Sequence, residues 1–120
     1  MSNQKVQVVF KGEVADAILA NQNHFSMCSQ VVELARKSAS HMERIDIKRA
    51  WSVTEIESVV KCIENTLNDS TKYPNKSGSE FESLQRFLNH LVEQTEKQLN
   101  LKITYNKSLN QIGAKDAPPG

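Results

Sequence analysis

The chain has 120 residues and a mass of 13.5 kDa, which fits one ordinary domain or two very small ones. Hydrophobic residues make up 38% of it and aromatic residues 6%, so we expect oligomerisation to supply part of the core. No apolar stretch reaches the length of a membrane span, and the N-terminus lacks the apolar segment of a secretory signal. The sequence therefore predicts a cytoplasmic protein with no membrane contact, and two reduced cysteines, Cys28 and Cys62.

Net charge is +1, but its distribution is uneven. Residues 1–49 carry seven Lys/Arg against five Asp/Glu, residues 50–100 carry five against eight, and residues 101–120 carry three against one. This pattern of a basic head, an acidic middle and a basic tail favours a head that binds a polyanion.

The residues that could bind a phosphate or a metal or act in catalysis do not form a recognisable motif in this sequence. The four glycines are too far apart to form a phosphate-binding loop, and none of His24, His41 and His90 has a second histidine four residues away. The carboxylates fall on polar helical faces rather than in a converging group. We therefore expect no enzyme activity, no cofactor and no metal site.

The first element predicted is a strand over residues 5–11. Val6, Val8 and Phe10 share one face, and the alternate positions are polar or exposed, which is typical of a half-buried strand. The only other strand-like segment, 101–105, lies about ninety residues away and also fits a continuation of a helix. A lone strand leaves its backbone groups unpaired, so we expect it to pair with the same strand of a second chain.

Two helices should follow the strand. A short apolar stripe predicts a helix from Glu13 to about Asn21, and a second helix, capped by Ser26 or Ser29, should run to about residue 45. Strand, helix and helix within about forty residues is the order of a ribbon-helix-helix head. The predicted fold class is mostly α: this head, with an intersubunit two-stranded antiparallel β-ribbon, followed by a helical-hairpin oligomerisation domain.

The hairpin is predicted from two capping boxes. Ser52 to Glu55 should cap a third helix that ends near residues 68–70, with Trp51 packing against Ile56 as a hydrophobic staple. Ser79 to Glu82 should cap a fourth helix after a loop at 69–79. Their apolar stripes are short for a free-standing coiled coil, so we expect them to pack on each other and on other subunits. The predicted oligomerisation residues are Ile56, Val59, Val60, Ile63, Phe81, Leu84, Leu88 and Leu91.

A ribbon of two strands fits the DNA major groove, and here it would turn Lys5, Gln7 and Val9 toward the bases. Gln can pair with adenine, Lys with guanine or phosphate, and Val can contact the thymine methyl group. Phosphate contacts are expected from Lys11 and from the start of the second helix, whose free N–H groups favour an anion. The helix-start residues are Ser26, Met27, Cys28 and Ser29. The alternative is an edge strand with solvated lysines.

Several short strings, taken in order over residues 4–99, resemble TraM, the relaxosome DNA-binding family of F-like conjugative plasmids. They are Lys5-Val6-Gln7-Val8, Phe25-Ser26, Val32-Glu33-Leu34, His41-Met42-Glu43-Arg44, Ala50-Trp51 with Thr54-Glu55, and Ser77-Gly78 through Phe81-Glu82. The resemblance implies a ribbon-helix-helix head that binds sites near the transfer origin and a helical body that forms tetramers. It also implies that the body binds the C-terminal tail of the coupling ATPase.

The sequence departs from the family at the expected tail-binding lysine, where it has Glu80, and Lys76 is the nearest basic residue. The predicted domains are a DNA-binding head at 1–49, a tetramerisation domain at 50–105 and a flexible tail at 106–120. The predicted function is sequence-specific binding of double-stranded DNA as an accessory of conjugation, linking the relaxosome to the coupling ATPase. The alternatives are a ribbon-helix-helix repressor, antitoxin or partition adaptor, and a helical interaction module that binds no nucleic acid.

Overall fold

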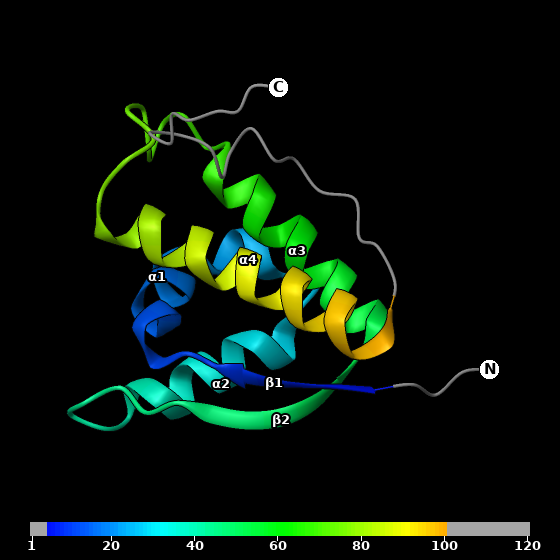
Figure 1. Ribbon diagram of the computed structural model, residues 1–120. Helices are drawn as coiled ribbons and strands as arrows, with labels where there is room; N and C mark the ends of the chain where they lie inside the picture. Colours follow the sequence, from blue (N-terminus) through cyan, green and yellow to red (C-terminus); the bar gives the residue numbers. More distant parts are fainter. Residues whose placement is uncertain (1–4, 101–120) are drawn as a thin grey trace, which may run out of the picture.

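The structure is a computed structural model that describes residues 5–100. It is a mostly helical domain with one two-stranded antiparallel sheet (Figure 1). In chain order the elements are β1 (Lys5–Phe10), the 3-10 helix η1 (Gly12–Val14), α1 (Ala15–Ala20), the 3-10 helix η2 (Gln22–Phe25), α2 (Ser29–Ala39), β2 (Ile47–Ser52), α3 (Val53–Leu67) and α4 (Ser79–Leu99). No helix among residues 5–100 combines the length and hydropathy needed to cross a membrane.

The sheet pairs β1 with β2 of the same chain, so the predicted intersubunit ribbon is wrong. Val6 lies opposite Trp51, Val8 opposite Arg49 and Phe10 opposite Ile47. The strand predicted over residues 5–11 is present as β1, but its partner β2 lies about forty residues further along the chain, between the predicted second and third helices, where the sequence analysis predicts no strand. An intrachain partner satisfies the backbone groups of β1 without a second subunit.

The ribbon has one buried and one more exposed face. Side chains alternate between the two faces along each strand, and residues paired across the strands point to the same face. Val6, Val8 and Phe10 are at most 1% exposed, and Trp51 is fully buried opposite Val6. The Trp51 indole Nε1 donates to the backbone carbonyl of Val8 at 3.3 Å, which satisfies its only polar group. In Figure 1 the ribbon runs along one edge of the molecule, with α4 lying next to β1.

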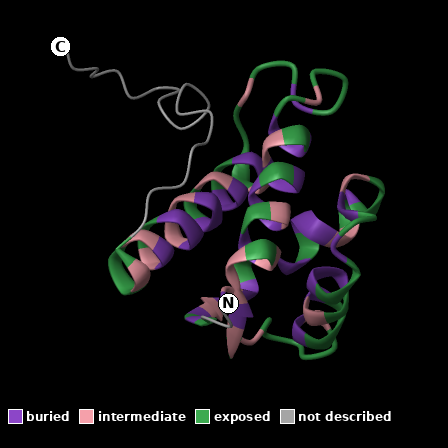
Figure 2. Cartoon of the chain, turned by 90° about the vertical axis from the view of Figure 1, so that its right-hand side faces the viewer, coloured by how far each residue is buried: buried purple, intermediate pink, exposed green. Residues whose placement is uncertain are grey.

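One hydrophobic core joins the ribbon to all the α-helices. Phe10 of β1 packs edge-to-face on Phe87 of α4, with ring centroids 5.5 Å apart. Buried residues line the faces that α3 and α4 turn toward each other, as Figure 2 shows in purple. The boundary predicted at 49/50 falls inside β2, and the core has members on both sides of it. Residues 101–105 and the predicted tail at 106–120 lie outside the described residues.

The cap of α3 is as predicted, and that of α4 is not. The Ser52 hydroxyl accepts from the Glu55 N–H at 3.1 Å, and the Glu55 carboxylate accepts from the Ser52 N–H at 3.0 Å. Helix α4 instead begins after Gly78, whose φ of 111° suits only glycine, and Ser79 is its first helical residue. No side chain caps this helix start.

Helix α2 also differs from the prediction. Its N-cap is Cys28, without a side-chain cap bond, so neither Ser26 nor Ser29 has the predicted capping role. It ends at Ala39 rather than near residue 45 because the chain must then extend into β2. The Ser38 hydroxyl donates to the Ile45 carbonyl at 2.7 Å and holds this return segment against the helix end.

Candidate nucleic-acid interface

The outward face of the ribbon brings together side chains from both strands. Lys5, Gln7 and Val9 alternate on β1, and the register places Ser52, Ala50 and Lys48 opposite them on β2. The side chains of Lys5, Gln7 and Lys48 are exposed, and the other three positions are partly exposed. We call these six residues the outer ribbon face.

The long side chains of this face are available for contact. Among residues 5–100, no hydrogen bond or ion pair engages the side chains of Lys5, Gln7 or Lys48. The backbone of Gln7, by contrast, is held by Gln98 of α4. The Gln7 N–H donates to the Gln98 side-chain oxygen, and the Gln98 side-chain nitrogen donates to the Gln7 carbonyl, each at 2.9 Å. This pairing covers the free edge of β1 at its centre and holds the Gln7 side chain outward.

The two lysines of the face lie toward opposite ends of the ribbon. Lys48 faces Val9, four residues along β1 from Lys5, which places the two positions about 13 Å apart at ordinary strand rise. Between them lie an amide and small or branched apolar side chains. The predicted base-contact residues Lys5, Gln7 and Val9 therefore lie on one face of the ribbon, and a single chain supplies both strands of that ribbon.

The predicted phosphate contacts do not form one group. Lys11 follows the end of β1 farthest from Lys5 and is partly buried. Ser26, Met27 and Ser29 are exposed just before and at the start of α2. Cys28 is only 3% exposed, and its N–H donates to the Phe25 carbonyl at 2.9 Å, so it offers an anion neither its side chain nor its amide.

A cavity of about 130 Å³ opens where the start of α2 meets the end of β2 and the start of α3. Arg49 lies over the Trp51 ring, 5.1 Å from its centroid, and its Nη2 is 3.5 Å from the Glu55 carboxylate. Glu55 also accepts from the Gln30 side-chain amide at 2.8 Å. Because this carboxylate lies beside the only cation among the cavity's lining residues, the cavity is not a strong anion site.

The predicted oligomerisation residues lie inside the single chain. All eight are at most 3% exposed and belong to the common core. They are Ile56, Val59, Val60, Ile63, Phe81, Leu84, Leu88 and Leu91. The stripes on α3 and α4 thus pack within one chain, and a tetramer stays a prediction for which these side chains supply no exposed surface.

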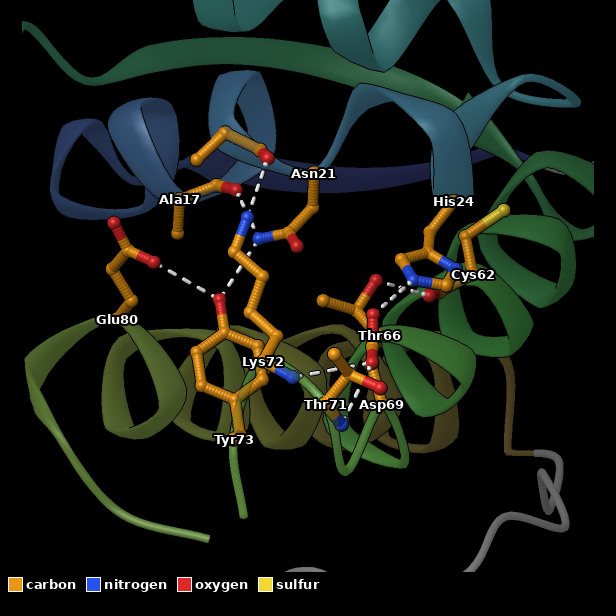
Figure 3. A network of polar contacts seen from close by, with 11 residues as sticks. Ala17, Asn21, His24, Cys62, Thr66, Asp69, Thr71, Lys72, Tyr73 and Glu80 are labelled. Carbon is orange, nitrogen blue, oxygen red and sulfur yellow. Dashed lines mark hydrogen bonds and ion pairs between the residues drawn. The ribbon is translucent and has the colours of Figure 1, made fainter. Parts of the chain in front are cut away.

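The predicted partner-binding residues, Glu80 and Lys76, differ in their surroundings, and Figure 3 shows those of Glu80. Glu80 accepts from the Tyr73 hydroxyl at 2.9 Å, and that hydroxyl accepts from the buried Asn21 amide at 2.9 Å. Glu80 therefore helps to anchor the loop between α3 and α4. Lys76 lies in the same loop with a positive φ of 51°. Binding of a coupling-protein tail here stays a prediction.

A second contact in Figure 3 ties the same loop to η2. His24 Nε2 lies 3.0 Å from the Asp69 carboxylate, and this hydrogen bond holds the pKa of Asp69 below its usual value. Within residues 5–100, no three His, Cys, Asp or Glu side chains gather in a way that could hold a metal ion.

Sequence analysis missed the half of the surface that β2 supplies. Ile47, Arg49 and Trp51 alternate with Lys48, Ala50 and Ser52, which is the period of a strand. A charged residue at the middle inward position conceals that alternation. Comparison with protein families, with curated proteins and with solved structures finds no match to this chain.

Proposed function

We propose that this protein binds double-stranded DNA through the outer ribbon face. The observation that carries the proposal is the joint exposure of Lys5, Gln7 and Lys48 on one two-stranded ribbon, with no intrachain partner for their side chains among residues 5–100. A two-stranded ribbon has the width that the major groove admits, and its inner face is packed on the helical core, which supports it from behind.

The charges on the face set the expected strength of binding. Two lysines that each neutralise one phosphate give a slope of about −2 in a plot of log affinity against log salt. Affinity should then fall roughly tenfold between about 50 mM and 200 mM salt. Gln7 adds sequence preference rather than bulk affinity, because a bidentate amide contact to adenine discriminates by about 1–3 kcal/mol.

The narrower role rests on the sequence resemblance alone. As an accessory protein of plasmid conjugation, the chain would bind near a transfer origin and link the relaxosome to the coupling ATPase. The intrachain ribbon departs from the arrangement that the resemblance implies, so each monomer would carry a complete reading surface. Any homo-oligomer would then strengthen binding through multivalency rather than by completing the ribbon.

Fluorescence anisotropy with labelled duplexes tests this proposal. One duplex has a random sequence and the other carries repeats from a candidate transfer origin, and each is titrated at several salt concentrations. Lys5→Ala and Lys48→Ala should each weaken binding to both duplexes and reduce the salt slope by about 1. Gln7→Ala should weaken binding only to the preferred sequence.

Lys61→Ala is the matched control, because Lys61 is exposed on α3, away from the ribbon. It should bind as the parent does. The proposal is wrong if the parent shows no binding at low salt, or if the ribbon variants and the control bind equally well. The first of these results favours a helical interaction module without nucleic acid.

A further inference from the structure

The two cysteines of the chain meet in the core, although they are 34 positions apart. Cys28 occupies the N-cap of α2 and Cys62 lies in the middle of α3. Their Sγ atoms are 3.4 Å apart, and the residues are 3% and 2% exposed. This is the distance of a thiol hydrogen bond rather than of a covalent bond.

We propose that Cys28 and Cys62 are an oxidisable dithiol, which a peroxide converts into an intrachain disulfide in the folded protein. The inference is independent of DNA binding. A disulfide bond is about 2.05 Å long, so the sulfurs must approach by roughly 1.4 Å. Cys28 precedes the first turn of α2 and has non-helical backbone angles, so the loop before α2 can absorb this movement while α3 stays intact.

The cavity beside the ribbon gives the oxidant a route. Cys28 lines this cavity of about 130 Å³, and Met27, 69% exposed, lies at the same cavity. Hydrogen peroxide is little larger than water, whose share of liquid volume is about 30 Å³, so the cavity has room for it. Cys62 does not line the cavity, which makes Cys28 the sulfur that is oxidised first and Cys62 the one that then attacks the oxidised Cys28 to form the disulfide.

The reaction balances with one peroxide per thiol pair. Cys28 loses its proton to solvent, and its sulfur attacks one peroxide oxygen, so that the O–O bond breaks and hydroxide leaves and is protonated to water. The product is a sulfenic acid on Cys28. The Cys62 sulfur then attacks the Cys28 sulfur: the S–S bond forms, the S–O bond breaks, and the leaving hydroxide takes the Cys62 proton as a second water. Two thiols are oxidised by two electrons, and the peroxide is reduced to two waters.

The environment makes this oxidation slow. Burial, the Cys62 thiol and the nearby Glu55 carboxylate raise the pKa of Cys28 to about 12, and burial also raises the pKa of Cys62. Thiolate is the reactive form, so little of it is present at neutral pH. Arg49, the cation that lines the same cavity, lies beside the Glu55 carboxylate. Oxidation of this pair should therefore be much slower than that of an exposed cysteine with an ordinary pKa at the same peroxide concentration.

Peptide mapping of the folded full-length chain tests the proposal. After treatment with millimolar hydrogen peroxide and alkylation, a non-reducing tryptic digest should contain peptide 12–36 linked to peptide 62–72, and dithiothreitol should separate them. Because peptide 12–36 also contains Met27, the linked pair should weigh two hydrogens less than the sum of the two peptides with Met27 in the same oxidation state, and fragment spectra should separate oxygen on Met27 from oxygen on Cys28. Cys62→Ser should give no linked pair, and its Cys28 should instead carry one or more oxygen atoms.

Two methionines show whether the oxidant acted. Met27 and Met42 are 69% and 94% exposed and should gain oxygen under the same conditions. The proposal is overturned if both cysteines still alkylate after unfolding in samples incubated well beyond complete oxidation of both methionines, or if the link forms only between two chains. Overoxidation of Cys28 in the parent without any linked peptide would overturn it as well.

Discussion

Replacing Leu88 with alanine distinguishes the packing seen here from the tetramer seam that the sequence suggested. Leu88 lies in α4 and is fully buried within the single chain. Removing a fully buried leucine side chain costs about 2.7–5.0 kcal/mol, because the transfer free energy is lost and a cavity remains. The unfolding free energy of a domain of this size is about 5–15 kcal/mol, so the loss is a large fraction of it.

The assay is thermal unfolding followed by circular dichroism over a hundredfold range of protein concentration. Each kcal/mol lowers the Tm of a domain of 60–100 residues by about 4–8 °C, so Leu88→Ala should lower it by about 10 °C or more. Glu93→Ala, at an exposed position on the same helix, should change the unfolding free energy by about 0.5 kcal/mol or less. Light scattering of both variants should give the mass of the parent.

A different outcome would refute the packing argument. If Leu88→Ala keeps the parent's Tm at low protein concentration but halves the particle mass, the side chain lies between subunits and not in the core of one chain. A Tm that depends on protein concentration in the parent and not in the variant would lead to the same conclusion.

Three further changes test local features of the fold. Gly12→Ala should lower the unfolding free energy by about 1–3 kcal/mol in denaturant titrations, because its Cβ would overlap the Arg44 carbonyl; an unchanged midpoint would contradict this close approach. Ser52→Ala should cost about 1 kcal/mol by removing the cap of α3, and a neutral result would show that the capping box does not form. Burial and the nearby Lys11 lower the pKa of His90, with Glu93 acting in the opposite direction, so the unfolded chain binds the proton more tightly. Stability should therefore be complete above about pH 6.5 and fall as the pH drops toward 5, and His90→Gln should remove part of that fall; identical pH profiles of parent and variant would contradict the assignment.

Local sequence signals predicted those elements whose determinants lie within a few residues. The alternation of Val6, Val8 and Phe10 gave β1, and the Ser52–Glu55 capping box gave the start of α3. The apolar stripes of α3 and α4 correctly marked buried faces. What they could not show is whether those faces meet within one chain or between chains, because periodicity is the same in both cases.

The missed strand β2 explains the largest error. Arg49 occupies an inward position of β2, so this position looks polar in the sequence. Its charge is accommodated there by stacking over the Trp51 ring and by the Glu55 carboxylate at the start of α3. Without a visible intrachain partner for β1, an intersubunit ribbon was the simplest way to satisfy its backbone. A segment with one partly buried charge can still be a strand when the neighbouring helix supplies the opposite charge.

The outer ribbon face was predicted in part. Lys5, Gln7 and Val9 lie on the outward face, as their alternation predicts. Lys48 also belongs to this face, but the sequence analysis did not include it because it did not predict β2. The thiol contact was beyond sequence reasoning, because Cys28 and Cys62 show no spacing motif and meet only where the fold brings the N-cap of α2 against α3. The same holds for the hydrogen bond between Asn21 and Tyr73, which joins residues 52 positions apart.

Amide NMR spectroscopy during titration with a short DNA duplex tests the central claim most directly. Binding through the outer ribbon face predicts that the amide signals of that face shift or broaden first, while those of the exposed side of α3 around Lys61 stay in place. The signals concerned are those of Lys5, Gln7, Val9, Lys48, Ala50 and Ser52. Spectra that leave these six signals unchanged at saturating DNA, or that shift only signals on α3 and α4, would contradict the account.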